Sequence, residues 1–139
     1  MTARTLAEFL RTSASRLAKG PIAILLIEHE TAVARTLTHH LNAGFRLVLA
    51  LSPAPLPVHL LPEDRHGRIV NLIHDSRHAQ AHVSAVNAVI GAAPADTWLY
   101  YGYNAEFLFY PFSETRSVNE MLTFHAEERR RAMLTYEID

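Results

Sequence analysis

Cysteine is absent from the 139 residues of this chain, which excludes disulfides and thiolate metal sites. Lysine occurs once, as Lys19, and the formal net charge of −1 gives no electrostatic reason to expect a nucleic acid or an acidic membrane as a partner. The five glycines are isolated from one another, so there is no Gly-rich phosphate loop. No apolar run approaches the roughly 20 residues needed to span a bilayer, so no transmembrane segment is expected. The lack of cysteine fits a reducing, cytoplasmic location.

The N-terminal residues have the pattern of an amphipathic helix over residues 4–19, which Gly20 and Pro21 would stop. Basic, Ser-rich helices of this kind also occur in organelle transit peptides. A helix packed on the flank of the domain is the preferred interpretation. The apolar residues that share one face of it are Leu6, Phe9, Leu10 and Leu17.

A strand–helix–strand unit follows. Residues 22–27 are a continuous apolar run, as in a strand buried on both faces of a sheet. Residues 31–42 have helical periodicity, and Gly44 follows at the place where a helix usually ends in glycine. Residues 45–51 form the next apolar strand, so the unit has the βαβ form of a parallel sheet. The apolar face of its helix comprises Val33, Leu37 and Leu41.

The second half alternates in the same way. Four prolines in residues 52–62 predict an extended loop. A strand is predicted over residues 68–73, a helix over 76–92, a second helix with a capping box over 117–133, and a last strand over 134–138. Together these elements predict an α/β domain. The apolar face expected for the helix over 76–92 comprises Ala79, Val83, Val86 and Ile90.

We expect one domain over residues 1–139, which is long enough to bury a core. Residues 1–20 would form its N-terminal helix and residues 21–139 its core. Because the last predicted strand stops at Asp139, we expect this core to be truncated at its C-terminal end. A homo-oligomer is compatible with the sequence.

An aromatic stretch, residues 98–112, holds the only Trp and four of the five Tyr. Its length and apolarity predict a buried strand. The polar residues Gly102, Tyr103, Asn104 and Glu106 interrupt it. A carboxylate such as that of Glu106 is costly at a buried strand unless it has a partner or ligand. Since open α/β proteins place their sites at the carboxyl ends of strands, this cluster is a candidate site.

Two stretches together resemble one family. Residues 37–45, Leu-Thr-His-His-Leu-Asn-Ala-Gly-Phe, are similar to the "Trp-Leu-x-His-His-x-x-x-Gly" opening of a branch of the family 2 glycosyltransferases. Residues 96–111, Asp-Thr-Trp-Leu-Tyr-Tyr-Gly-Tyr-Asn-Ala-Glu-Phe-Leu-Phe-Tyr-Pro, resemble that branch's "Trp-(four residues)-Asp-x-Asp-Glu-Phe-Leu-x-x-Pro" strand in the same register. The resemblance covers residues 22–138, the nucleotide-binding half of such enzymes.

The resemblance implies a three-layer, Rossmann-like fold of the GT-A type, with a mostly parallel sheet and flanking helices. It implies the transfer of a sugar from a nucleotide-sugar donor to an acceptor. The family's Asn-Glu pair is approximated by Glu28-His29, and Ser52 lies where the family has an acid that faces the uridine or ribose. Nucleotide or substrate contacts are expected at the strand-end residues Glu28, Ser52, Asp75, Tyr103, Asn104 and Glu106.

The family's metal motif is not preserved. Such enzymes use a divalent cation, Mg²⁺ or Mn²⁺, held by carboxylates, to neutralise the diphosphate leaving group. In the aligned register Tyr103 replaces the first Asp and Ala105 the second, while Glu106 is retained. Neither a phenol nor a methyl group is a usable Mg²⁺ ligand. The sequence therefore predicts that the cation ligands are lost, and it leaves catalytic residues unassigned.

Three alternatives remain. The chain is either a transferase domain or a non-catalytic descendant that binds a ligand or protein at the same strand ends. The acidic end of residues 22–30 is also similar to a phosphoacceptor receiver domain, with Asp75 as phosphoacceptor, although no Lys follows Asp75.

His74, His78 and His82 would align on one helical face as metal ligands could, but an exposed polar face is the preferred interpretation. His40 is predicted to be a packed or hydrogen-bonded structural residue.

Overall fold

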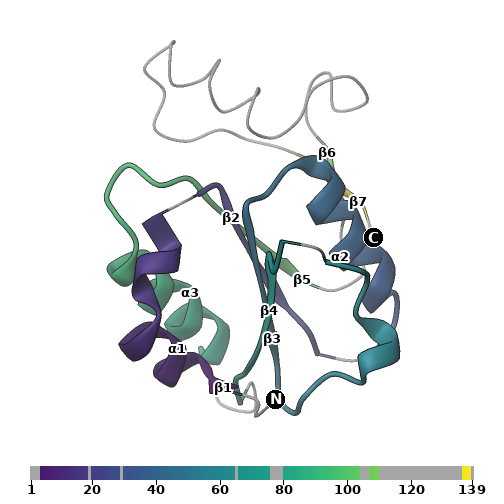
Figure 1. Ribbon diagram of the computed structural model, residues 1–139, viewed down its shortest axis with the longest axis horizontal. Coiled ribbons are helices and arrows are strands. Elements are labelled where there is room, and N and C mark those ends of the chain that lie inside the picture. Colours follow the sequence, from purple (N-terminus) through teal and green to yellow (C-terminus); the bar gives the residue numbers. More distant parts are fainter. Residues whose placement is uncertain are drawn as a thin grey trace.

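The computed structural model describes residues 4–18, 20–28, 30–64, 66–75 and 80–103, and the backbone of residues 107–109 and 136–138. Five strands form a parallel sheet in the order β1-β4-β3-β2-β5 (Figure 1). They are β1 (Arg4–Thr5), β2 (Ile22–Leu26), β3 (Leu47–Ser52), β4 (Ile69–Ile73) and β5 (Leu99–Tyr103). Helices α1 (Leu6–Thr12) and α3 (Ala81–Ala92) lie on one face of this sheet, and α2 (Val33–Ala43) lies on the other. The predicted α/β class with a parallel sheet is confirmed.

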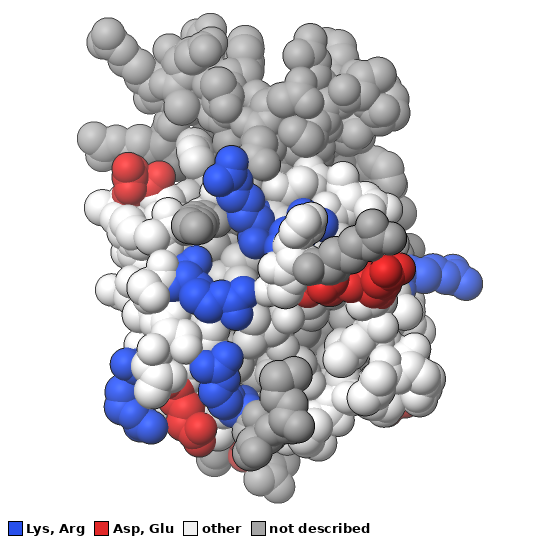
Figure 2. All heavy atoms as spheres, in the orientation of Figure 1, with Lys and Arg blue, Asp and Glu red and all other residues white. Residues whose placement is uncertain are grey.

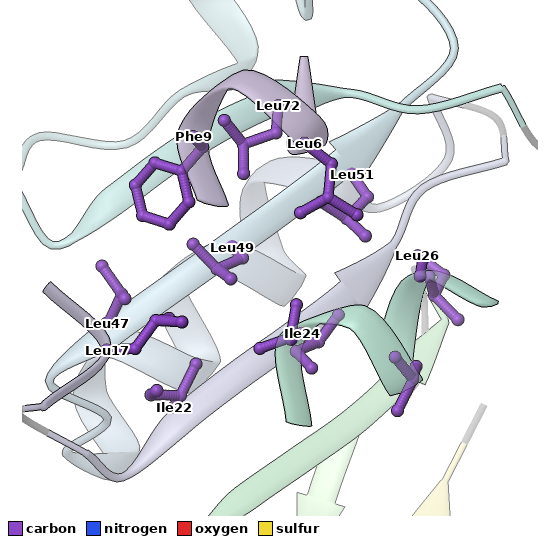
Figure 3. Packing of buried hydrophobic residues seen from close by; sticks show 13 residues of the cluster. Leu6, Phe9, Leu17, Ile22, Ile24, Leu26, Leu47, Leu49, Leu51 and Leu72 are labelled. Carbon is purple, nitrogen blue, oxygen red and sulfur yellow. The ribbon is translucent and has the colours of Figure 1, made fainter. Parts of the chain in front are cut away.

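The middle of the sheet is formed by β2 and β3, as their continuous apolar runs predict. Every residue of both strands is buried. Successive side chains point to opposite faces, so Ile24 and Leu49 pack beneath α1 and α3 (Figure 3), while Leu25 and Val48 pack beneath α2. A strand with water on neither side needs apolar residues at every position, and this is why the periodicity of two is missing here.

The predicted helix between β2 and β3 is present as α2. Its buried residues include the predicted Val33, Leu37 and Leu41, together with His40. The helix ends at Gly44, whose φ of 104° is left-handed and whose N–H bonds the carbonyl of Leu41. The predicted bounds of β2, α2 and β3 therefore agree with the structure to within two residues at each end.

The N-terminal segment differs from the single helix predicted over residues 4–19. Arg4 and Thr5 pair with β4, the α-helix ends at Thr12, and a 3₁₀ helix, η1 (Ala14–Ala18), follows. Thr12 hydrogen-bonds back to the Glu8 carbonyl, and the Arg4 guanidinium donates to Ser13 Oγ at 2.8 Å. Such local bonds by hydroxyl side chains compete with the helical pattern. The predicted apolar residues still face the core: Leu6, Phe9 and Leu17 are buried and Leu10 is half-buried.

The helix α3 packs with a different face from the one predicted. Val83 and Ile90 are 56% and 51% exposed, and Ala79 lies outside the described residues. Of the three described residues of the predicted stripe, Val86 alone is buried. Because α3 is apolar around most of its circumference, periodicity does not select a face, and the packing of its small residues against α1 and the sheet decides it. The residues that α3 buries are Ala81, Ala85, Val86 and Val89.

The aromatic stretch is not one long buried strand. It forms β5, which lies at one end of the five-stranded sheet, and then a separate strand, β6 (Phe107–Phe109). Tyr101 and Tyr103 point outward and are exposed. The strand predicted at residues 134–138 is present as β7 (Tyr136–Ile138), antiparallel to β6. The predicted helix over residues 117–133 lies outside the described residues.

Gly102 leaves room for a neighbouring side chain inside β5. A Cβ atom at Gly102 would lie 2.5 Å from the hydroxyl of Tyr100, because the Tyr100 ring extends along the strand over this position. That ring in turn stacks on His40, with centroids 5.4 Å apart. The absence of a side chain at Gly102 therefore allows the Tyr100 ring to lie close to the backbone.

The visible surface carries both charge signs. On the face drawn in Figure 2, Arg side chains lie near Asp and Glu side chains, with uncharged residues between them. In the part of the chain that the structure describes, no helix has the length and apolarity required to cross a bilayer.

Candidate functional site

The carboxyl ends of β2 and β5 form the candidate site. These two strands are neighbours, with Leu26 paired to Tyr103 at their last residues. The chain leaves β2 toward β3 on one side, whereas β5 comes in on the other side after the chain has passed through β4. Sheets of this kind bind ligands in the crevice where the strand order reverses, outside the carboxyl ends. This edge is therefore where side chains of β2 and β5 could meet a ligand.

Three side chains from three elements meet at this edge. Glu28 follows β2, Tyr103 ends β5, and His82 belongs to the first turn of α3. Nε2 of His82 lies 2.9 Å from Oε1 of Glu28, although the two residues are 54 positions apart. The Tyr103 ring stands edge-on to the His82 ring, with centroids 5.3 Å apart and an interplanar angle of 88°. The structure thus unites two predicted site residues, Glu28 and Tyr103, through His82.

The electrostatics of this cluster follow from its donors and acceptors. An ionised carboxylate only accepts hydrogen bonds, so Nε2 of His82 carries the hydrogen in this contact. Glu28 keeps 48% of its side chain exposed, so solvent and small ligands reach it. A charge-assisted bond of this kind is shorter and stronger than a neutral one. The cluster can present an oriented carboxylate beside an aromatic ring, a combination suited to hydroxyl-bearing ring compounds.

Ser52 is built into the loop that follows β3. Its buried hydroxyl donates to the Ala54 carbonyl at 2.7 Å and accepts from Nδ2 of Asn71 at 2.9 Å. Asn71 also donates to the Ala50 carbonyl and accepts from the Leu56 N–H. The described contacts of Ser52 are therefore structural, and its predicted contact with a ligand stays a prediction.

Replacing Asn71 with alanine should lower the free energy of unfolding by about 1.5 kcal/mol, because the Leu56 amide and the Ser52 hydroxyl each lose a partner in a half-buried setting. Urea denaturation measures this change. Asn87, which is exposed on α3, supplies the control: Asn87→Ala should change the free energy by less than about 0.5 kcal/mol. Equal effects of the two variants would show that the Asn71 network does not hold the loop.

The other predicted site residues lie elsewhere or outside the description. Asp75 follows β4 at the same edge of the sheet and is half-buried. The backbone before it is tied to β3, since the His74 N–H donates to the Ser52 carbonyl at 2.8 Å. Asn104 and Glu106 lie outside the described residues, so their predicted roles stay predictions.

The histidine row does not form a metal site in the described part of the chain. His74 Nε2 contacts the Ala81 carbonyl at 3.1 Å, whereas His82 pairs with Glu28, and His78 is not among the described residues. No group of three His, Cys, Asp or Glu side chains that could hold a metal ion occurs among the residues described. At the position of the family's first Asp, Tyr103 presents a phenol that packs on His82. The other three positions aligned with the family's metal motif, residues 104–106, lie outside the described residues, so the loss of the cation ligands stays a prediction.

His40 is the structural residue that the sequence predicts. Its side chain is fully buried, and Nδ1 donates to the Thr36 carbonyl at 2.7 Å. Burial lowers its pKa from 6.5 to about 4, although the bond to Thr36 acts in the opposite direction. His40 is therefore neutral at pH 7 and belongs to the packing beneath β5, away from the Glu28 cluster.

The residue that sequence reasoning missed is His82 as the partner of Glu28. Its position in the first turn of the helix that follows a strand end was a signal, but nothing in the sequence indicated which acid it would meet. Comparison of the chain with known protein families, with curated proteins and with solved structures found no match.

Proposed function

We propose that the chain is a glycosyltransferase family 2-like domain that binds a nucleotide-sugar at the carboxyl ends of β2 and β5 and transfers the sugar to an acceptor. The observation that carries the proposal is the meeting of Glu28, His82 and Tyr103 at the point where the strand order reverses. In chain order, β2 to β5 are arranged third, second, first, fourth. This arrangement is the one found in Rossmann-type nucleotide-binding sheets and supports the proposal.

The described residues have clear tasks in such a site. Glu28 can accept hydrogen bonds from donor hydroxyl groups, and Tyr103 offers a partly exposed ring that a base or sugar can pack against. In the transfer, the bond from the anomeric carbon to the diphosphate oxygen breaks, and its electron pair leaves with the nucleoside diphosphate. A bond from the anomeric carbon to an acceptor hydroxyl oxygen forms, and the hydroxyl proton is released to water. Because Tyr103 stands where a metal-binding Asp would be needed, nucleotide binding here is proposed to be independent of divalent cations.

The presence of Tyr103 in place of an Asp also favours a second function, in which the domain binds a ligand without transferring a sugar. A phenol that packs edge-on against His82 cannot neutralise a leaving diphosphate as a carboxylate-held cation would. A domain with this site could hold a nucleotide or sugar without reacting it. The two functions share the Glu28 cluster and differ in whether nucleoside diphosphate is released.

The receiver alternative is not proposed. In receiver domains the first strand lies between the second and the third. Here the third of the core strands, β4, lies beside β3, and β2 lies between β3 and β5. Asp75 therefore does not flank the strand that ends in Glu28, as the phosphoacceptor of a receiver would.

Thermal unfolding in the presence of UDP, UDP-glucose and UDP-N-acetylglucosamine tests the proposal. A ligand present at 100 times its Kd adds about 2.7 kcal/mol to the stability, which raises the Tm of a domain of this size by several degrees. We expect that rise to be equal with Mn²⁺ and with EDTA. Inorganic phosphate and glucose, each alone, are the controls and should leave Tm unchanged.

Each outcome has a clear meaning. A rise seen only with Mn²⁺ would contradict the cation-independent site, and no rise with any of the three compounds would overturn the proposed function. Chromatographic detection of UDP released from the sugar nucleotide then separates the two functions. Release above the rate without protein supports transfer, and binding without release supports the non-catalytic domain.

A further inference from the structure

The hydrogen bond between His82 and Glu28 joins two segments that are 54 residues apart in the sequence. Glu28 lies on the loop after β2, and His82 lies on the first turn of α3, the helix that precedes β5. Their hydrogen bond therefore joins the loop after β2 to the first turn of α3, beside the paired carboxyl ends of β2 and β5. A partly exposed pair of this kind contributes little to stability. The more important consequence of this bond is the orientation that it gives to the Glu28 carboxylate.

The His82 ring has one directional polar contact among the described residues. Nε2 donates to Glu28, whereas Nδ1 is buried and has no hydrogen-bond partner in the part of the chain described. The Tyr103 ring stands perpendicular to the imidazole and so restricts its rotation. The N–H of His82 is thus aimed at one oxygen, Oε1 of Glu28, and this contact restricts the orientations of the carboxylate.

An oriented carboxylate recognises a particular chemical pattern. Two adjacent hydroxyl groups of a five-membered sugar ring can both donate to one carboxylate when its plane is held toward them. A deoxy sugar offers one donor fewer, and a buried or oriented acceptor that loses its donor is penalised. With 48% of its side chain exposed, Glu28 is accessible to such a diol.

We propose that His82 is a positioning residue that orients Glu28 to bind the 2′- and 3′-hydroxyl groups of the ribose in a ribonucleotide. This inference rests on the proposed function and assigns the sugar specificity of the same site. His82 does not itself touch the nucleotide, since its N–H is occupied by Glu28. The chain therefore prefers ribonucleotides to 2′-deoxyribonucleotides, and the preference depends on an N–H donor at position 82.

Affinity for UDP and for 2′-deoxy-UDP, measured by isothermal titration calorimetry on the full chain, tests the inference. Wild-type protein should bind UDP about tenfold more tightly than 2′-deoxy-UDP, the factor expected for one hydrogen bond to a charged group. His82→Leu should reduce this ratio to below about threefold. His82→Gln, which places an amide N–H near the position of Nε2, should keep the ratio within about a factor of three of wild type.

The matched control is His59→Leu, because His59 is exposed on the 3₁₀ turn η2 (Val58–Leu60). It should leave both affinities unchanged. Glu28→Gln is the second variant and should also lower the ratio, which keeps the inference testable if His82→Leu does not fold. A ratio that persists in His82→Leu or in Glu28→Gln would overturn the inference while leaving the proposed function in place. Wild-type protein that binds neither nucleotide would overturn both.

Discussion

Acidification from pH 7 to pH 4 should lower the free energy of unfolding by about 3 kcal/mol through His40 alone. The pKa of this side chain falls from 6.5 to about 4 in the folded protein, mainly because it is buried. Its proton is therefore bound more readily by the unfolded chain. The stabilisation is fully present above pH 6.5 and is lost as the pH falls toward 4, and each pKa unit corresponds to 1.36 kcal/mol.

The environment of Nε2 explains the lowered pKa of His40. Since Nδ1 carries the hydrogen that is donated to Thr36, protonation has to occur at Nε2, which is buried without a hydrogen-bond partner among the described residues. The rings of Phe45 and Tyr100 lie against the imidazole, with centroids 5.8 and 5.4 Å away. A cation at this position would have neither solvent nor an acceptor, and the nearby His39 would oppose it further.

Urea denaturation at pH values between 4 and 7 measures the effect. His40→Leu should flatten the pH dependence by about 3 kcal/mol over this interval, whereas His59→Gln at an exposed site should leave it as in wild type. The comparison is needed because nine histidines titrate in the unfolded chain. If His40→Leu kept the full pH dependence, burial of this ring would not be its source.

The sequence was informative where one local pattern determines the structure. Continuous apolar runs located β2 and β3, because a strand buried on both faces leaves no polar position. The spacing of Val33, Leu37 and Leu41 located α2, and Gly44 marked its end. In these elements the chemistry of a few adjacent residues is sufficient.

Long-range pairing was beyond such patterns. An aromatic run such as that of β5 suits an end strand as well as a middle one, and its place in the sheet depends on pairing with β2 about 77 residues earlier. The same limit applied to the site. Strand ends indicated Glu28 and Tyr103, but the partner that connects them, His82, comes from a helix whose position only the folded sheet defines.

The buried face of α3 differs from the face that periodicity in the sequence predicts, and substitutions at two adjacent residues test this difference. Val89 is fully buried on the inner face of α3, whereas its neighbour Ile90 is 51% exposed. Val89→Ala should lower the free energy of unfolding by about 2.5 kcal/mol, from two lost methyl groups and the cavity that they leave. Ile90→Ala, which removes a larger side chain, should cost less than about 0.5 kcal/mol. Because both changes leave alanine at adjacent positions of one helix, helix propensity favours both variants. Urea denaturation of the two variants would contradict the packing of α3 if Ile90→Ala proved the more destabilising.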